Sequence, residues 1–402
     1  MRPPSLEIFA TDVKQTAYPT ECALIRNKAA HDHAKSSASQ RPHPQLRNGV
    51  LDVDICVIGA GSGGLTLAAG AVQMGASVVL IAKHRMGDDR LNTGCVPSKA
   101  PLAATHAPQS PREAGRFGVV LPEPAIDFGR VHAHVRGVIG AIAPHDSVER
   151  FEGLGVTVIQ GAARLSGPTE VAAAGRQFRA RRFVIATGST AAAPPVPGLA
   201  ETPFLTNETV FDLTERPGHL LVLRGGPIGI QMAQAFRGLG SEVTVVERTM
   251  ILPRDEPEAV DVLRAILQRQ GITITEGAQV AAIRPIPESR RVEVELADGK
   301  IIVGSHLLVA AGRKPNMDGL DLSAAGVETT SRGITVDARL RTSNRRVFAS
   351  GDVAGGPQFT HVAGYHAGTR GPVRARSISL PRAMVSSSTS RARCFRARSA
   401  RR

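Results

Sequence analysis

Two stretches of the chain repeat one order of apolar runs and glycine-rich turns. The first begins at Val53 with a short apolar run, passes through Gly59-x-Gly61-x-x-Gly64 and a helical pattern, and ends in the apolar run SVVLI. The second begins at His219 and keeps the same order. Each order is typical of a β-α-β unit with a glycine-rich first turn. The pattern therefore predicts an α/β fold with two Rossmann-like domains.

The glycines of these turns predict binding of a dinucleotide. Glycine lets the chain turn tightly, and it lets a pyrophosphate approach backbone N–H groups at the start of the following helix. One such turn is weak evidence, whereas two turns, each after a strand and before a helix, are specific. The alternative for each turn is a tight connection that binds no ligand.

The two copies depart from this pattern at different positions. In the second copy the middle and last glycines are Gly226 and Gly229, but the first position is Arg224. An acid that would hold the ribose hydroxyls follows as Glu247, 18 residues after the last glycine, whereas the same offset in the first copy gives Ala82. We expect Glu247 to bind a ribose, with a solvated acid at a strand end as the alternative.

The net charge of +14 is concentrated at the C-terminal end of the 402-residue chain. Residues 371–402 carry nine arginines and no acid, which leaves +5 for the rest. Such a segment buries too little apolar surface to fold alone, so we expect a disordered basic tail. It lacks the repeated aromatic residues that stack on bases, and we expect no specific nucleic-acid partner.

Other features bear on location and metal binding. No stretch approaches the roughly 18–20 apolar residues that span a membrane, and the N-terminal end lacks the apolar centre of a signal peptide. We therefore expect a cytoplasmic protein with no membrane partner. The four cysteines, Cys22, Cys56, Cys95 and Cys394, are scattered and have no zinc-ligand spacing, so we expect no metal site.

Several further motifs occur in order between Val53 and Gly368. They are LNTGCVPSK, FVIATGS, GGPIG, LLVAAGRKPN and VFASGDVAGGPQFTHVAGYHAG. With the first glycine turn, they make the chain similar to the class I pyridine nucleotide-disulfide oxidoreductases, the family of mercuric reductase, dihydrolipoamide dehydrogenase and glutathione reductase. The resemblance implies an FAD-dependent oxidoreductase that passes hydride from NAD(P)H to FAD and on to a small-molecule acceptor.

The resemblance also implies domain boundaries. An FAD-binding domain would comprise residues 51–197 and be completed by the return segment 319–370, with an NAD(P)-binding domain at 198–318 inserted between them. Residues 1–50 would form an irregular N-terminal extension, and 371–402 the basic tail. The C-terminal dimerisation domain would be missing, so the expected family homodimer would lack its interface.

The resemblance assigns roles in FAD binding. The pyrophosphate would lie over the three glycines of the first turn, with Thr187 and Gly188 closing over the site. Asp352 would accept a hydrogen bond from the ribityl chain, and Lys99 would lie near flavin N5. The alternatives are a turn aspartate at Asp352, an ordinary lysine at a helix start, and a plain buried strand before Thr187.

The resemblance likewise assigns the second turn to NAD(P)H. The two glycines of that turn and Glu247 would bind the dinucleotide, with Gly312 and Arg313 near its cleft. The choice between NAD and NADP stays open, because Glu247 favours NAD while the adjacent Arg248 suits a 2′-phosphate.

The redox loop departs from the family pattern, which is Cys-x-x-x-x-Cys. Cys95 corresponds to the flavin-side thiol, but Arg90 stands at the exchange position, and Gln231 replaces the acid that would pair with Lys99. Cys95 and Lys99 are the candidate catalytic residues, with disulfide turnover impaired. The alternatives are a cysteine-independent NAD(P)H:FAD oxidoreductase of the transhydrogenase or diaphorase type, and a non-catalytic truncated product that binds flavin.

Overall fold

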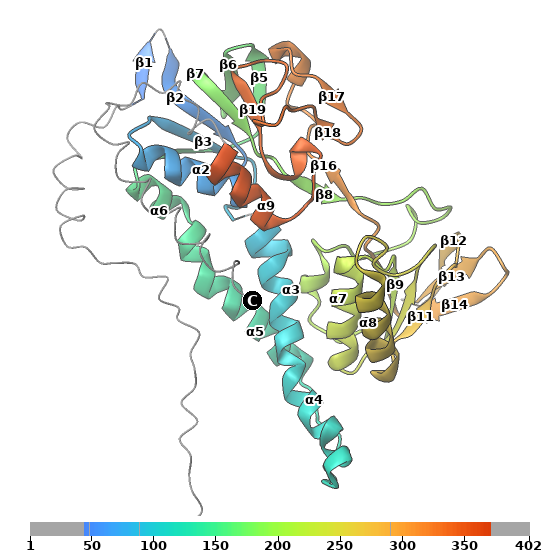
Figure 1. The fold of residues 1–402 in the computed structure, drawn as a ribbon. Helices are drawn as coiled ribbons and strands as arrows, with labels where there is room; N and C mark the ends of the chain where they lie inside the picture. The colour runs from blue at the N-terminus through green and yellow to red at the C-terminus, as the bar shows by residue number, and fades with distance from the viewer. Residues whose placement is uncertain (1–43, 48, 88, 290, 371–402) are drawn as a thin grey trace, which may run out of the picture. The chain divides into compact units, whose positions relative to one another are not determined.

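The computed structural model describes residues 44–47, 49–87, 89–289 and 291–370 (Figure 1). They all belong to one compact unit that begins at His43. Most of the predicted N-terminal extension and all of the predicted basic tail lie outside the described residues. Among the helices that are described, none combines the length and the apolar character needed to cross a membrane.

A mixed sheet of eight strands has the order β4-β3-β2-β7-β6-β5, with β1 beside β2 and β19 beside β7. β2, β3, β4, β7 and β19 pair in parallel. The helix α2 (Ser62–Gln73) connects β2 to β3, which confirms the first predicted β-α-β unit. The strands are β1 (Gln45–Arg47), β2 (Val50–Ile58), β3 (Val78–Ala82), β4 (Thr157–Gln160), β5 (Ala163–Gly167), β6 (Glu170–Ala173), β7 (Arg176–Ile185) and β19 (Val347–Ala349).

A second sheet has the order β11-β10-β9-β15, and all of its strands are parallel. The helix α7 (Pro227–Gly238) connects β9 to β10, which confirms the second predicted unit. An antiparallel group, β12-β13-β14, contains the alternating run VEVEL in β13. The strands are β9 (His219–Leu223), β10 (Glu242–Val246), β11 (Thr273–Thr275), β12 (Val280–Pro285), β13 (Val292–Leu296), β14 (Ile301–Gly304) and β15 (His306–Val309).

Apolar cores cover both faces of the parallel strands in each sheet. In β2, Ile55 belongs to one core cluster and Cys56 to another, because successive side chains of a strand point to opposite faces. In β9, Leu220 and Leu221 are divided between two clusters in the same way. Parallel strands buried on both faces give continuous apolar runs, which explains why both runs were visible in the sequence.

Two short strands run between the sheets. β8 (Ser189–Ala191) follows β7, and β16 (Arg313–Pro315) follows β15; the two pair antiparallel. The chain then returns to the first sheet through β19, which pairs with β7. The order of elements is therefore first sheet, second sheet, first sheet.

The helix α3 (Cys95–Ala104) packs against both α5 and α7 (Figure 1). A Cβ on Gly238 of α7 would lie 2.6 Å from the Thr105 side chain, so the two helices approach closely at that end. The other helices are α4 (His106–Glu113), α5 (Phe128–Ile142), α6 (Val148–Gly153), α8 (Pro257–Arg269) and α9 (Thr360–Tyr365). Shorter elements are η2 (Asp89–Thr93), η3 (Ala114–Phe117), η4 (Ala143–Asp146), η5 (Val210–Asp212), η6 (Leu322–Ala325), η7 (Gly351–Ala354), η8 (His366–Arg370), β17 (Thr329–Thr330) and β18 (Gly333–Ile334).

Candidate active site

The first glycine turn joins β2 to α2 with little room for side chains. Gly59 has a φ of +112°, and a Cβ there would lie 2.3 Å from the carbonyl oxygen of Ala186. A Cβ on Gly64 would lie 1.9 Å from the carbonyl oxygen of Gly59. Gly61 caps α2, and no described side chain caps its first N–H groups. These donors suit a pyrophosphate, so the turn fits the FAD site expected there.

A buried hydroxyl beside this turn also fits a polar ligand. Ser350 is 4% exposed, and its Oγ has no hydrogen-bond partner among the described residues. A Cβ on Gly63, in the first turn of α2, would lie 3.3 Å from that oxygen. Buried hydroxyls are normally paired, so a ligand atom at the start of α2 would complete this one.

The first turn lacks an acid for the ribose. β3 ends at Ala82, which is buried, and the next residue, Lys83, is exposed. The adenosine ribose of a dinucleotide at this turn would therefore find an apolar side chain at the strand end where the fingerprint usually has a carboxylate.

The second turn repeats the backbone of the first with an arginine at its first position. The N–H of Arg224 donates to Val246 at 2.9 Å, as the N–H of Gly59 donates to Ile81 at 2.9 Å. Arg224 has a φ of +85°, a left-handed conformation that costs a non-glycine residue about 1–2 kcal/mol. A Cβ on Gly229 would lie 2.2 Å from the Arg224 carbonyl oxygen, which matches the close contact in the first turn.

Glu247 follows β10 and is held by this turn. Its side chain is buried, and its carboxylate accepts from the N–H groups of Gly225 at 2.7 Å and Thr249 at 3.1 Å. Arg224 Nη1 lies 3.3 Å from Glu247 Oε1. Burial acts to raise the pKa of Glu247, but the two backbone hydrogen bonds and the arginine outweigh it and place the pKa below its ordinary value. Gly226 caps α7, again with no described side-chain cap.

The redox loop forms the short helix η2 and then α3. Cys95 is the first residue of α3, and its Sγ lies 3.5 Å from Thr360 Oγ1, which belongs to α9. Lys99 is exposed and follows one turn later, so both candidate catalytic side chains share a face of the helix. Since α9 packs against α2, this end of α3 lies beside the first β-α-β unit.

Arg90 is fixed by an ion pair. Its Nη2 lies 2.8 Å from Oδ2 of Asp146, whose side chain is only 9% exposed. Asp146 ends η4, 56 residues further along the chain. The position where the family has its exchange cysteine is thus occupied by the Arg90 guanidinium, which is held by the Asp146 carboxylate.

The described residues hold two cysteines, Cys56 and Cys95, and both are free thiols. Cys56 lies in β2 and is fully buried, which strongly raises the pKa of its thiol. A thiol in that state is inert toward exchange. Cys22 and Cys394 lie outside the described residues.

Arg313 joins three segments of the site. Its guanidinium donates to Ser189 Oγ and to the Ser189 carbonyl oxygen, each at 2.7 Å. It also lies 3.3 Å from Asp89 Oδ2, in the redox loop, and 3.7 Å from Asp352 Oδ2. Ser189 Oγ donates in turn to Asp352 Oδ2 at 2.6 Å. Sequence reasoning missed Ser189 and Asp89, although Ser189 is the last residue of the FVIATGS motif that contains Thr187.

The remaining predicted residues lie at the crossing strands. Thr187 Oγ1 donates to the Asn316 carbonyl oxygen at 2.7 Å, and Asn316 Nδ2 donates to the Thr187 carbonyl oxygen at 3.0 Å. Gly188 and Gly312 have φ values of +67° and +116°. Both turns into and out of the second sheet therefore need glycine.

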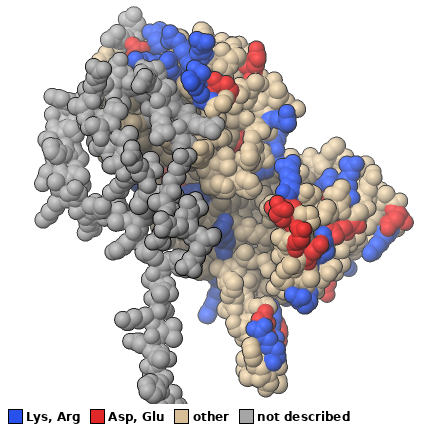
Figure 2. Space-filling model, viewed as in Figure 1, with Lys and Arg blue, Asp and Glu red and all other residues tan. Residues whose placement is uncertain are grey.

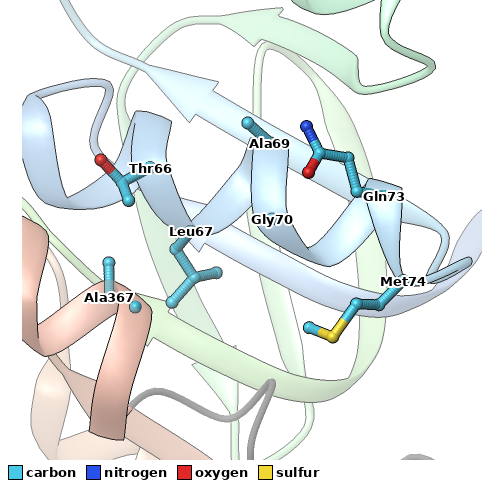
Figure 3. A pocket seen from close by; sticks show the side chains of 8 residues that line it. Thr66, Leu67, Ala69, Gly70, Gln73, Met74 and Ala367 are labelled. Carbon is cyan, nitrogen blue, oxygen red and sulfur yellow. The ribbon is translucent and has the colours of Figure 1, made fainter. Parts of the chain in front are cut away.

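Most of the predicted cofactor-binding residues follow the carboxyl ends of parallel strands in the two sheets, where open α/β sheets bind ligands. The first glycine turn, Thr187 and Asp352 follow strands of the first sheet, while the second turn, Glu247 and Gly312 follow strands of the second. Arg313 faces Asp352 rather than Glu247. A shallow cavity of about 360 Å³ lies along α2 beside η8 and includes none of the predicted residues (Figure 3).

Figure 2 shows basic and acidic side chains next to one another on the right-hand part of the molecule, while other residues form most of the uncovered surface in this view.

A fold with two glycine turns, each at a parallel sheet, and a cysteine at the start of a helix between them defines a two-dinucleotide oxidoreductase. The family described as pyridine nucleotide-disulphide oxidoreductase matches residues 53–367, and the chain belongs to this family. FAD and NAD(P)H are the cofactors of the family, as the sequence predicted.

Individual relatives support membership of this family. The chain is 37% identical to a mercuric reductase of Streptomyces lividans, over 78% of this chain and 68% of that protein. It is 35% identical to a dihydrolipoyl dehydrogenase of Thermus scotoductus, over 77% and 68%. It covers only 51% of a Bacillus cereus mercuric reductase, at 34% identity. An HOCl-induced flavoprotein disulfide reductase from Escherichia coli has a similar structure, with a TM-score of 0.70, 28% identity, and coverage of 78% and 69%.

Proposed function

We propose that the chain binds FAD and NAD(P)H and passes hydride from NAD(P)H through FAD to a small-molecule acceptor, with the disulfide exchange of its relatives impaired. The observation that carries this proposal is Arg90. It stands five residues before Cys95 and is paired with Asp146, so the loop has one thiol where exchange needs two.

The chain's own residues would act in binding and orientation. The first turn would present N–H donors to the FAD pyrophosphate, because Gly59 and Gly64 keep side chains away from it. Asp352, held by Ser189 and Arg313, would accept a hydrogen bond from the ribityl chain. Lys99 would place a positive charge near the flavin. FAD, when bound, supplies the chemistry that accepts and releases hydride.

The same observation favours a second candidate function. An enzyme that passes electrons directly from FAD to a quinone, a dye or a second nicotinamide needs no cysteine pair. In that case Cys95, with Thr360 as its neighbour, would be dispensable for turnover.

The visible spectrum of the purified chain with added FAD tests binding, and anaerobic bleaching by NADH or NADPH tests hydride transfer. Turnover is then measured with a disulfide acceptor and with a quinone. We expect flavin bands, bleaching and quinone reduction, with little disulfide reduction. Disulfide turnover that Cys95→Ser abolishes would contradict the proposal, since another thiol would then complete the pair.

Arg90→Cys should restore a dithiol that NADH reduces near the flavin, without full disulfide turnover, because Gln231 still replaces the acid beside Lys99. Arg85→Cys is the matched control, since Arg85 is exposed and lies outside the exchange position. Arg90→Cys should also lower stability by about 1–2 kcal/mol, because the buried Asp146 loses its partner. Thiol titration of oxidised and reduced protein, with thermal unfolding, gives both results. Equal titration of the two variants would contradict the assignment of the loop.

A further inference from the structure

The loop that precedes Cys95 begins on the first glycine turn. The N–H of Gly87 donates to the carbonyl oxygen of Ala60 at 3.0 Å, inside that turn. Two residues later, Asp89 begins η2. Because two residues of chain span at most about 7 Å, the loop brings a carboxylate close to the place where the pyrophosphate of FAD would lie.

Asp89 shares one guanidinium with Asp352. Oδ2 of Asp89 lies 3.3 Å from Nη2 of Arg313, and Oδ2 of Asp352 lies 3.7 Å from Nε of the same side chain. The side chain of Arg313 is 9% exposed, while those of Asp89 and Asp352 are 35% and 15% exposed. Within this group, two negative charges therefore face one positive charge at a place that is partly shielded from water.

Hydrogen bonds hold these charges in place. Nε and Nη2 of Arg313 donate to the hydroxyl and the carbonyl oxygen of Ser189, each at 2.7 Å. The hydroxyl of Ser189 donates in turn to Asp352 Oδ2 at 2.6 Å. Asp89 is held separately, because its Oδ1 accepts from Thr93 Oγ1 at 3.0 Å. The carboxylate of Asp89 therefore stays beside Arg313 when a ligand reaches the turn.

FAD brings further negative charge to the same region. A carboxylate near its pyrophosphate repels it, and the repulsion is strongest where water is excluded. A guanidinium that pairs with the carboxylate cancels most of this repulsion. Removing the guanidinium leaves an uncompensated charge, which costs more than the pair itself contributes.

We infer that Asp89 sets how strongly the chain holds FAD, because its carboxylate opposes the pyrophosphate and binding depends on Arg313 to cancel that charge. Arg313 thereby acts on FAD rather than on the nicotinamide dinucleotide. The inference rests on the proposed function, because it takes the first turn to be the FAD site. It gives the redox loop an influence on FAD binding that needs no thiol.

The test is titration of FAD into the flavin-free full chain, followed by flavin fluorescence. Arg313→Gln should weaken FAD binding at least about tenfold, because the charge of Asp89 is then uncompensated. Arg313→Lys keeps the positive charge and should retain most of the affinity. Adding Asp89→Asn to Arg313→Gln should restore most of the lost affinity. Asp89→Asn alone should bind FAD at least as tightly as the parent chain.

Lys314→Gln and Asp318→Asn are the matched controls. Lys314 is the neighbour of Arg313 in β16, and its Nζ lies 2.8 Å from Asp318 Oδ2 in an ion pair whose side chains are both exposed. Each control removes the same kind of charge as its test variant, and both should leave the FAD affinity unchanged. Added salt should narrow the gap between Arg313→Gln and the parent chain, because salt screens the charge of the partly exposed Asp89.

The reduction potential of the bound flavin gives a second measurement. Reduction adds negative charge to the flavin, so Asp89→Asn should shift the potential to a less negative value. Arg313→Gln, measured at saturating FAD, should shift it to a more negative value for the same reason. Shifts of one sign in both variants would overturn the inference, because the two substitutions would then act only by distorting the fold.

Three binding results would overturn the inference and leave the proposed function standing. These are weaker FAD binding in Asp89→Asn alone, equal losses in Arg313→Lys and Arg313→Gln, and a loss in Arg313→Gln that Asp89→Asn does not relieve. Asp89 would then serve only to hold the loop. Absence of FAD binding by the parent chain would overturn both, since the first turn would then not be a cofactor site.

Discussion

The two glycine turns make the same backbone hydrogen bonds but carry different side chains at the positions that would contact a dinucleotide. In the first, the N–H of Ala186 donates to Ile58 at 2.7 Å, and in the second the N–H of Ala310 donates to Leu223 at 3.0 Å. The first turn keeps its glycines and ends its second strand at Ala82, whereas the second keeps an acid and carries an arginine. The backbone geometry of such a turn is therefore kept when substitutions at the first glycine or at the strand end change the side chains that a ligand would meet.

The comparison shows what the first glycine of each turn does. Gly59 cannot be replaced without a clash, because the carbonyl oxygen of Ala186 would lie 2.3 Å from a Cβ. At the equivalent position of the second turn, Arg224 fits with a strained backbone and a guanidinium that meets Glu247. The guanidinium of Arg224 pairs with the buried Glu247, and the first turn has Ala82 in place of that acid.

The largest expected effect is on the first turn. Gly59→Ala should destabilise the chain by about 3 kcal/mol and abolish FAD binding, because it adds both left-handed strain and a backbone clash. Gly70→Ala, in the interior of the same α2 helix with open space around its Cβ position, should instead stabilise by about 0.5–1 kcal/mol. Chemical unfolding with flavin fluorescence measures both. Equal stability of the two variants would mean that the first turn tolerates a side chain as the second does.

A smaller effect should follow from giving the first turn the acid of the second. Ala82→Glu should tighten FAD binding about tenfold, because the introduced carboxylate could accept from the ribose and from the N–H groups of Ala60 and His84, the counterparts of Gly225 and Thr249. Ala82→Gln, with the same shape and no charge, is the control and should gain less. Calorimetric titration with FAD measures the affinities of both variants. Weaker FAD binding in Ala82→Glu would show that the introduced carboxylate finds no hydrogen-bond donors at this position.

The smallest effect should appear in the acid dependence of stability. The pKa of Glu247 is lower in the folded chain than its ordinary value of 4.5, so its contribution is present above about pH 4.5 and is lost as the pH falls through the folded pKa. Glu247→Gln should therefore flatten the loss of unfolding free energy below that pH. Urea unfolding across this range measures the slope, with Glu242→Gln, an exposed acid at the start of β10, as control. If the unfolding free energy fell equally steeply with pH in the parent chain and in Glu247→Gln, Glu247 would not be the group whose lowered pKa causes the loss.

Periodic features were predictable, and long-range side-chain partners were not. Both β-α-β units followed from apolar runs and turn residues, which are local in the sequence, and the two nucleotide cofactors followed from the resemblance of the motifs to those of the family. The pairing of Arg90 with Asp146 and of Arg313 with Asp89 and Ser189 depends on how distant segments pack. The backbone donors of Glu247 were hidden for a related reason: Gly225 and Thr249 lie beside this carboxylate only because the turn folds over the strand end.

Because β8 and β16 pair antiparallel, the chain passes into the segment of the second sheet and returns from it at neighbouring positions. Ser189 is the register partner of Pro315, so the chain leaves the first sheet and comes back between neighbouring strands about 5 Å apart. A segment inserted at a single point can be lost, gained or exchanged in one genetic event without reordering the strands around it. A substitution inside that segment, such as an arginine at position 224, therefore leaves the strand order of the first sheet unchanged.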